Sequence, residues 1–425
     1  MPILNHTYLK HYFLNGFLMP KEFHNETMFE GIKRQSQAVC FNKVPESKLS
    51  FLEAQQAFAE LLKTAVAKCL SKQKKVAVEL SGGLDSSCLA YLTRKQLQEK
   101  KIYAFTHKIP DSCFYESTYD ESPWSIKVTK ELDLKQIFLN SEENLHKLIE
   151  ESSEILGQFS EVLFPILNLP TLKIAKELGI NTILSGFGGD EVVSGSGNLY
   201  LKELKDKKKY LDWVYEKSRK ISFKKFKELL TVNIKNLEEN HLTYLSDNLL
   251  QETQIKLLKH ENINSREKNL TQGELSLHWK RRIEVSQTLA SHYGISYEFP
   301  LVDRELMQFF HQLPSSYKYS HGQSRRMMRY FLKRNFLRSI GNRYDKAGCT
   351  TPAGRFFLIK NLPKVFLERI PENYRGVLSD YLNLKKVRKR LEEGPCSSSG
   401  ILRILVAALM IYHLEKNSWK KSLLN

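Results

Sequence analysis

Two short glycine-rich segments carry the residues best suited to chemistry. The first, Ser-Gly-Gly-Leu-Asp-Ser-Ser at residues 81–87, directly follows the apolar run VAVEL. Paired glycines let a backbone turn tightly around an anion, and the N–H groups that open a following helix attract phosphate. A carboxylate at Asp85 would repel phosphate, so it is best explained as a magnesium ligand beside a polyphosphate. We therefore predict a phosphate-binding loop formed by Ser81, Gly82, Gly83, Asp85, Ser86 and Ser87.

The second segment, Ser-Gly-Phe-Gly-Gly-Asp-Glu at residues 185–191, ends the strand-like run NTILSG. It is again a flexible turn that carries acids at the carboxyl end of a strand, where open parallel sheets bind their ligands. Two such turns on neighbouring strands could share magnesium between Asp85 and Asp190. We place Gly186 and Gly188 with the nucleotide-binding residues.

The surrounding pattern alternates between strands and helices. The predicted order is a helix at 51–70, a strand at 76–80, a helix at 86–99, a strand from 101, a helix at 171–180 and a strand at 181–186. This alternation predicts an α/β fold with a parallel sheet and flanking helices. Residues 1–50 look irregular, and from about residue 199 the chain reads as mostly helical. No Gly-Lys-Ser/Thr follows the first segment, which excludes a Walker A loop.

Composition limits the remaining possibilities. The 425 residues are 41% hydrophobic and 11% aromatic, enough for a large core. No stretch reaches the roughly 18 apolar residues of a membrane span, and the first residues lack a signal-peptide pattern, so we expect a cytoplasmic protein without a membrane partner. The six cysteines are scattered without a Cys-x-x-Cys pair, which argues against a zinc site or a disulfide framework.

The formal net charge of +18 raises the question of an acidic partner. The lysine clusters at 72–75 and 205–209 are not interleaved with aromatic residues, as a groove for single-stranded nucleic acid requires. This disfavours nucleic acid. An acidic peptide or a polyanionic cofactor suits the charge equally well.

The motifs resemble those of a known family. The first segment resembles the loop of the ATP pyrophosphatase superfamily, whose members cleave ATP to AMP and pyrophosphate. Both segments together resemble the asparagine synthetase group, which includes β-lactam and carbapenam synthetases and lasso-peptide cyclases. The resemblance covers about residues 30 to 415, and further matching segments are Asp120-Glu121 and residues 300–314, 321–332 and 346–352.

The resemblance implies an adenine nucleotide alpha hydrolase-like fold that uses ATP and Mg²⁺. A carboxylate substrate, an amino acid or a peptide, would attack the α-phosphorus to give an acyl adenylate, which an amine or ammonia would then convert to an amide. Lys346 matches the lysine that neutralises charge in the second step, and Glu284 could orient the amine. Arg325 and Arg326 match a helix of the group, and the sequence leaves open whether they act in the site or lie on a solvated face.

Three further acidic residues have structural interpretations. Asp303 lies beside an apolar stretch, which favours a structural role. Asp120 and Glu121 match an acidic pair of the group, but they could equally cap the helix that follows.

The sequence departs from full asparagine synthetases in two places. Position 2 is Pro instead of the catalytic Cys, so we expect residues 1–50 to be a remnant of the glutaminase region. Residues 51–415 would form the synthetase domain and 416–425 a tail. We therefore expect no glutamine hydrolysis by this chain, and nitrogen from free ammonia, a separate glutaminase or an amine on the substrate. The second departure is Phe187, where the group carries Glu or Tyr; Phe cannot hydrogen-bond or exchange protons.

These departures favour a specialised ligase, such as a macrolactam cyclase of the lasso-peptide type with a precursor-peptide partner. The alternative is an asparagine synthetase that uses free ammonia or a separate glutaminase subunit. An inactive scaffold and an RNA-thiolating enzyme are further alternatives. Intact Asp85, Asp190 and Lys346 argue against the scaffold, and the second segment matches a different branch from the thiolating enzymes.

Overall fold

The computed structural model describes residues 3–15, 22, 25–33, 46–70, 75–98, 101–108, 121–140, 144–193, 198–218, 241–247, 249, 277–335, 337–343, 350–394 and 399–418. Its centre is a parallel sheet with the strand order β3-β2-β1-β4-β5. The strands are β1 (Val76–Glu79), β2 (Ile102–Lys108), β3 (Lys135–Asn140), β4 (Thr182–Leu184) and β5 (Ser296–Glu298). From β1 the chain builds outward to β3, then returns to the other side of β1 for β4 and β5. The order therefore reverses between β1 and β4.

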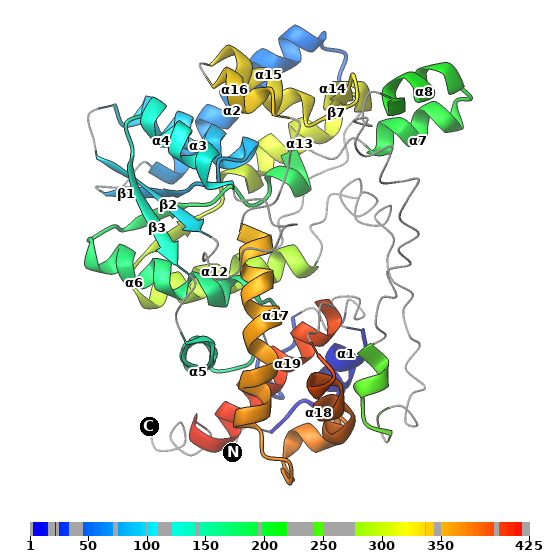
Figure 1. Ribbon diagram of the computed structural model, residues 1–425. Coiled ribbons are helices and arrows are strands. Elements are labelled where there is room, and N and C mark those ends of the chain that lie inside the picture. The colour runs from blue at the N-terminus through cyan, green and yellow to red at the C-terminus, as the bar shows by residue number, and fades with distance from the viewer. Residues whose placement is uncertain are drawn as a thin grey trace.

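Alternating side chains of β1 enter two separate cores. Val76 and Val78 face one core and Ala77 faces the other, as the period of two in a strand requires. The core of Val76 and Val78 is covered by α2 (Phe51–Leu70), α3 (Leu84–Gln96), α4 (Ser122–Glu131), α13 (Arg304–Gln312), α15 (Arg326–Arg334) and α16 (Arg338–Gly341). The core of Ala77 is covered by α5 (Leu145–Leu156), α6 (Leu169–Glu177) and α12 (Leu277–His292). The sheet thus has helices on both faces, as expected for parallel strands (Figure 1).

A second, helical part extends the core of Ala77. It is formed by α17 (Thr350–Arg369), α18 (Leu384–Glu392) and α19 (Ser399–His413), and α17 runs lengthwise from the sheet into it (Figure 1). The mostly helical C-terminal part predicted from the sequence is confirmed for the described residues.

The N-terminal helix α1 (His6–Asn15) packs among these C-terminal helices (Figure 1). Phe13 stacks on Tyr381 with ring centroids 5.3 Å apart, and Arg403 donates a hydrogen bond of 2.9 Å to the carbonyl of Tyr12. The prediction that residues 1–50 are irregular is wrong here. Tyr8 and Leu9, then Tyr12 and Phe13, recur at helical spacing and are fully buried.

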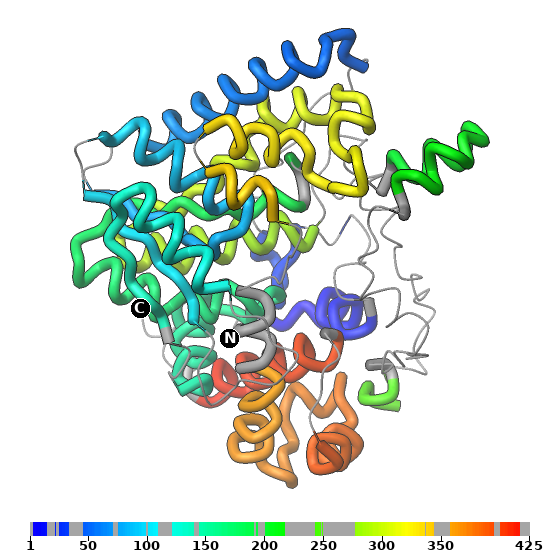
Figure 2. Tube along the Cα trace, turned by 45° about the horizontal axis from the view of Figure 1, so that its top comes forward, coloured from blue at the N-terminus to red at the C-terminus, as the bar shows by residue number. Residues whose placement is uncertain are grey.

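The remaining elements are short or peripheral. Helices α7 (Asn198–Asp206) and α8 (Tyr210–Ser218) project from the body (Figure 2). The others are η4 (Phe164–Asn168), η5 (Gly189–Val193), η6 (His241–Tyr244), η7 (Pro300–Val302), α14 (Ser315–Lys318), β6 (Tyr319–Ser320), β7 (Gln323–Ser324), η8 (Val377–Asp380) and η9 (Leu414–Ser418). Among the described helices, none combines the length and apolar character that a membrane crossing needs.

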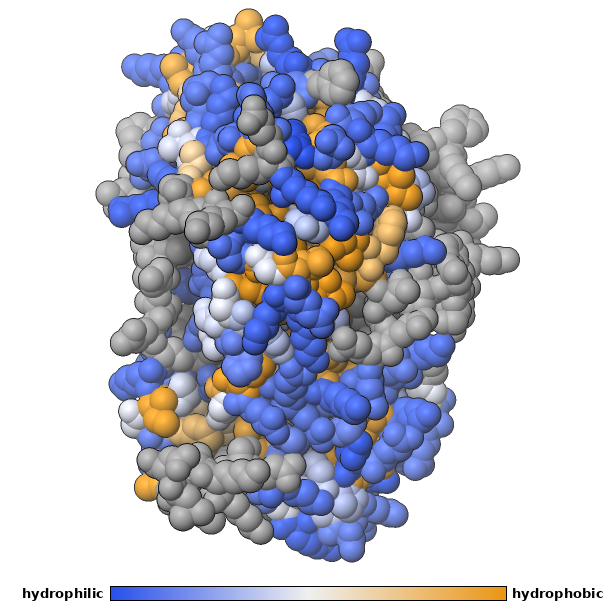
Figure 3. Space-filling view, turned by 90° about the vertical axis from the view of Figure 1, so that its left-hand side faces the viewer, coloured by the Kyte–Doolittle hydropathy of each residue, from blue (hydrophilic) through white to orange (hydrophobic). Residues whose placement is uncertain are grey.

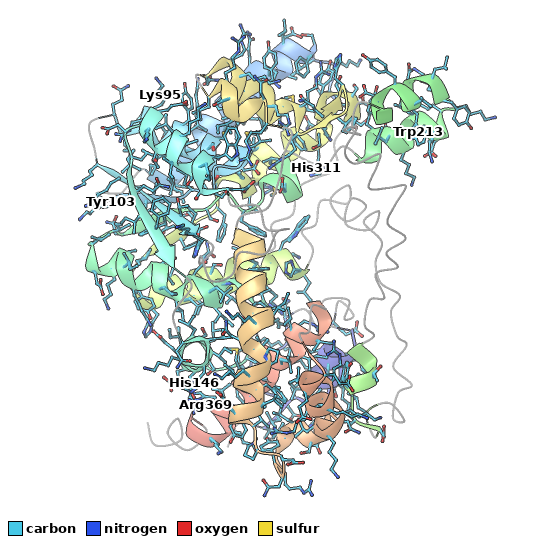
Figure 4. The ribbon with its side chains drawn as sticks, in the orientation of Figure 1. Lys95, Tyr103, His146, Trp213, His311 and Arg369 are labelled. Atoms are coloured by element: carbon cyan, nitrogen blue, oxygen red, sulfur yellow. The ribbon has the colours of Figure 1, made fainter. Side chains whose placement is uncertain are left out.

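Part of the positive charge lies at the amino end of the sheet. Lys75, Lys101 and Lys135 each place an ammonium group 5.5–5.6 Å from the ring centre of Tyr103, which is labelled in Figure 4. Each lysine precedes or opens one of three neighbouring parallel strands. The two glycine-rich loops lie at the opposite, carboxyl end. Figure 3 shows the side of the molecule that lies on the left in Figure 1, where hydrophilic residues cover most of the surface around a hydrophobic band.

Candidate active site

The two glycine-rich loops follow adjacent strands at the point where the strand order reverses. β1 pairs with β4 in the register Val76 to Thr182 and Val78 to Leu184. The loop after β1 leads into α3, and the loop after β4 leads into η5. Ligands of open α/β sheets bind in the crevice at such a switch point. The predicted neighbourhood of the two loops is therefore present in the fold.

The first loop is held from outside by a buried ion pair. Gly82 has a φ of +76°, and a Cβ there would lie 2.6 Å from Ser125 N and from Trp124 Cβ. Its carbonyl accepts a 2.7 Å hydrogen bond from Arg343, whose guanidinium also pairs with Glu121 at 2.7 Å and stacks 4.6 Å from the Trp124 ring centre. Only glycine fits this position, and Arg343 fixes the path of the loop.

This arrangement corrects the capping interpretation of Glu121. Glu121 occupies the N-cap position of α4, but its side chain makes no capping hydrogen bond. It is 3% exposed and orients Arg343 instead. Asp120 lies outside the described residues.

The loop hydroxyls are organised around the start of α3. Ser81 Oγ and Ser86 Oγ are 3.0 Å apart, and Ser81 Oγ accepts a 3.2 Å hydrogen bond from Gly83 N. Gly83 is the N-cap residue and supplies no side-chain cap, so the first N–H groups of α3 are left for a ligand. This is a geometry suited to phosphate. Ser87 is fully buried, Ser86 is 7% exposed, and Ser81 is half-buried.

The second loop packs directly on the first. A Cβ at Gly186 would lie 3.1 Å from Ser86 N, and one at Gly189 would collide with the carboxyl group of Asp85. Gly188 has a φ of +94°, and a Cβ there would lie 2.5 Å from Val302. Gly186 and Gly189 therefore allow the second loop to approach the first, which brings Asp190 beside Asp85, while Gly188 allows the second loop to pack on η7.

Arg325 bridges the two acidic side chains. Its Nη2 forms ion pairs with Asp85 Oδ2 and with Asp190 Oδ1, and Arg325 is 5% exposed. Burial and the neighbouring Arg329 lower the pKa of Arg325 to about 9, which leaves the guanidinium charged at neutral pH. Of the two locations left open for Arg325, the structure places it in the site. Arg326 instead stacks 3.9 Å from the Phe51 ring centre.

The two carboxylates have the chemistry of a magnesium site. Asp85 Oδ1 is buried and has no hydrogen-bond partner among the described residues. The Asp190 side chain is 38% exposed and so accessible to a ligand. No group of three or more His, Cys, Asp or Glu side chains in the described residues could hold a metal alone. Two carboxylates supplemented by phosphate oxygens and water suit Mg²⁺, which seldom occupies an all-protein cage.

A buried polar network supports the loops from below. Glu79, the last residue of β1, accepts hydrogen bonds from Ser185 at 2.7 Å, from Asn168 at 3.3 Å and from Tyr297. Burial, reinforced by Glu79, raises the pKa of Tyr297 well above its usual range, so its hydroxyl remains a donor. The network ties β1, β4 and β5 together. The sequence signal for this network was Glu79 within the apolar run VAVEL, because a buried charge needs hydrogen-bond partners.

Glu284 is placed on α12 by a second buried network. Arg281 pairs with Glu284 at 2.8 Å and with Glu161 at 2.7 Å, and both Arg281 and Glu161 are 1% exposed. Glu161 also accepts a hydrogen bond from Tyr8 of α1. The N-terminal helix therefore takes part in holding Glu284.

Arg282, which follows Arg281 on α12, faces the second loop. Its guanidinium carbon lies 4.3 Å from the ring centre of Phe187 and 5.5 Å from that of Phe164. Phe187 is 8% exposed and packs edge-on against Phe299. In an α-helix, residues two apart point about 200° apart. Arg282 and Glu284 therefore lie on opposite sides of α12, and the contact with the second loop is made by Arg282.

Two predicted positions remain. Lys346 lies outside the described residues. Asp303 is structural, as predicted: its carboxylate caps α13 by accepting from Glu305 N at 3.0 Å and Leu306 N at 3.1 Å, and it pairs with Lys68 at 2.9 Å.

A family model described as asparagine synthase matches residues 57–413. The chain belongs to the asparagine synthase family. Members of this family are ATP-dependent carbon–nitrogen ligases, and the resemblance found in the motifs is confirmed. The predicted parallel sheet with flanking helices is confirmed as well.

Two solved structures are distantly similar to this family member. One is an NH3-dependent NAD synthetase from Campylobacter jejuni subsp. jejuni NCTC 11168 in complex with nitrate, at 16% identity and a TM-score of 0.23, over 36% of this chain and 61% of that one. The chain thus spans less than two thirds of that protein. The other is the U34-tRNA thiolase NcsA from Methanococcus maripaludis with its [4Fe-4S] cluster, at 12% identity and a TM-score of 0.25, over 60% and 86%. No curated protein matches.

Proposed function

We propose that the chain joins a carboxylic acid to an amine by activating the acid as its acyl adenylate, with release of pyrophosphate and then AMP. The observation that carries this proposal is that the carboxylates of Asp85 on the first loop and Asp190 on the second loop lie close enough for Arg325 to bind both. They lie beside the start of α3, which has no side-chain cap. The proposed synthetase domain is residues 51–415, with helix α1 as part of its core.

Each residue has a proposed part in binding and orientation. The N–H groups at the start of α3, with Ser81 and Ser86, bind the phosphates, and Gly82, Gly83, Gly186 and Gly188 allow the backbone to approach them. Asp85 and Asp190 hold Mg²⁺, which neutralises phosphate charge when bound. Arg325 holds the two carboxylates in place. Lys346 is proposed to neutralise charge in amide formation. Glu284, which points away from the second loop towards Arg281, is proposed to orient the amine from that side of α12.

The finer proposal is a specialised ligase without its own glutaminase activity, such as a macrolactam cyclase. Phe187 supports it. Its ring is covered by Arg282 and packed on Phe299, which makes this side of the site aromatic and cationic. Such a surface suits an acid with a larger apolar part better than aspartate alone. We propose free ammonia or a substrate amine as the nucleophile. An asparagine synthetase fed by ammonia or by a separate glutaminase is the second candidate.

The nucleotide products of the purified chain test the proposal. ATP and Mg²⁺ are incubated with aspartate plus ammonia, with glutamate plus ammonia, or with peptides that carry an acidic side chain and a free amino terminus, and products are separated by chromatography. We expect acid-dependent AMP and pyrophosphate, abolished by Asp85→Ala and retained by Asp303→Asn, which preserves the cap of α13. ADP and phosphate would contradict the proposal.

The same assay separates the two candidates. Asparagine formed from aspartate and ammonia favours the second candidate, whereas a cyclised or ligated peptide favours the first. Glutamate formed from added glutamine would contradict the proposed lack of glutaminase activity.

A further inference from the structure

Arg282 is a cation held beside the second loop by aromatic rings. Its guanidinium stacks on Phe187 and lies within reach of Phe164, and the side chain is partly buried. Within the described part of the chain, Glu161 and Glu284 both pair with its neighbour Arg281, and Glu79 accepts hydrogen bonds from Ser185, Asn168 and Tyr297. Arg282 forms no ion pair with a described carboxylate.

A guanidinium stacked on a ring keeps its donors for another ligand. The stacking occupies one face of the planar group, while the N–H donors point outward in its plane. That edge matches a carboxylate, which can accept two parallel hydrogen bonds from it. Partial burial strengthens such a contact, because the surroundings are less polar than water. Arg282 is therefore preorganised for an anionic group.

The position of Arg282 favours the acid substrate over the nucleotide. Phe187 precedes Asp190 by three residues, so Arg282 stands beside the pair of carboxylates rather than between them. The place between them is taken by a different guanidinium, that of Arg325. An acid that attacks a phosphate must lie next to the phosphate site, and the aromatic rings that line this side would accept its apolar part.

We propose that Arg282 binds a carboxylate of the acid substrate while Phe164, which is half-buried, contacts its apolar part. The substrate class is then a carboxylic acid with an aliphatic or aromatic portion, in an amino acid derivative or a peptide. The assignment rests on the proposed function, since it presumes that an acid is activated in this site.

Acid-dependent exchange of labelled pyrophosphate into ATP tests it. The acids are aspartate, glutamate, N-acetylphenylalanine and a peptide with glutamate among apolar residues. For each active acid, KM for the acid and KM for ATP are measured with the wild type, Arg282→Met and Arg282→Lys. Lys280→Met is the matched control, because it removes a positive charge from the same helix two residues earlier. Thermal melting checks that each variant is folded.

We expect Arg282→Met to raise KM for the acid about 10- to 100-fold, as loss of a charge-assisted bidentate contact predicts, with KM for ATP within about twofold. Arg282→Lys should recover part of the loss, because it restores the charge without the planar fork. Lys280→Met should behave as the wild type. Apolar acids should exchange better than aspartate.

The contrary outcomes are distinct. An unchanged KM for the acid in folded Arg282→Met would contradict the proposed binding of the acid by Arg282 and leave the proposed function standing. A rise in KM for ATP alone would show that Arg282 binds phosphate, which also contradicts the proposed binding of the acid. Exchange with none of the acids by the wild type would contradict the proposed function itself.

Discussion

The carboxyl group of Asp85 lies directly against the backbone of Gly189, so closely that a Cβ on Gly189 would overlap it. The two residues belong to loops about a hundred positions apart, joined only because β1 and β4 are neighbours in the sheet. The contact explains why a glycine stands just before Asp190. It also gives the first of five predictions.

Gly189→Ala should displace Asp85 and abolish most of the acid-dependent exchange, since the added methyl group has no room. We expect a loss of about 1–3 kcal/mol in unfolding free energy, as for overpacking in a closely packed site. Urea denaturation and exchange kinetics measure the two effects. Gly157→Ala is the matched control. A Cβ there meets nothing within 4 Å, and its φ of +63° costs about 1–2 kcal/mol without touching the site. Equal activity of both variants would contradict the close contact.

Arg325→Gln should tighten divalent-cation binding to the nucleotide-free protein. The guanidinium engages the same two carboxylates, Asp85 and Asp190, that are proposed to bind magnesium. Its removal frees them and leaves their negative charges to attract a cation. Titration with Mn²⁺, followed by its electron paramagnetic resonance signal, measures the affinity. No detectable Mn²⁺ binding in either protein would argue that the acids are placed for Arg325 alone, and weaker binding in the variant would contradict the expected competition.

Arg343→Met should unfold more easily by about 3–5 kcal/mol, because it leaves Glu121 as a buried, unpaired charge. It should also weaken ATP binding, since the Gly82 carbonyl loses its donor. The control is Lys63→Met, which breaks an exposed pair with Glu60 and should change stability by no more than about 1 kcal/mol. Denaturant titration gives the change in unfolding free energy for both variants. A small effect of Arg343→Met would mean that the pair is solvated.

Tyr8→Phe tests whether α1 supports Glu284. The change removes one hydrogen bond to buried Glu161 and should cost about 1–3 kcal/mol of stability. Exchange should persist while amide formation slows, because Glu161 holds Arg281 and Arg281 holds Glu284. Comparing exchange with product formation checks the split, with Tyr210→Phe at a 58% exposed position as the control. Equal slowing of both steps would refute the specific role.

His311, labelled on α13 in Figure 4, predicts a pH dependence of stability. Burial, with a smaller contribution from Lys318, lowers its pKa to about 3. The unfolded chain therefore binds a proton below pH about 6.5 that the folded chain does not. The contribution of His311 to the unfolding free energy is fully present above pH about 6.5. It falls by about 1.4 kcal/mol per pH unit as the pH drops towards about 3. Unfolding free energies of the wild type and His311→Gln between pH 7 and 5 measure it, and parallel curves would contradict it.

The sequence predicted those parts of the site that depend on local spacing. Both loops follow strands and carry their own glycines and acids, so Asp85 and Asp190 could be placed from neighbouring residues alone. Helix α1 was not predicted, although its buried residues recur at helical spacing, because the run lies outside the alternation of strands and helices from which the other elements were predicted. The residues that pack around α1, such as Tyr381 and Arg403, come from the C-terminal part of the chain.

Partners distant in sequence could not be predicted in the same way. Arg325 lies 240 residues from Asp85, and Arg343 lies 222 residues from Glu121. Nothing in the local pattern of either arginine distinguishes a buried bridge from a solvated helix face. The same holds for Arg282, whose neighbour Arg281 has the same residue type and a different environment. Only the packing of α12 against the second loop separates the two.

The central claim is that ATP activates the acid at its α-phosphorus, and the path of one oxygen atom tests it most directly. The acid that gives the fastest exchange is prepared with ¹⁸O in its carboxyl group, converted with an amine, and the nucleotide products are analysed by mass spectrometry. The account predicts one ¹⁸O atom in AMP and none in pyrophosphate, because the carboxylate oxygen bonds to the α-phosphorus and leaves with AMP. Label in inorganic phosphate with formation of ADP would contradict it.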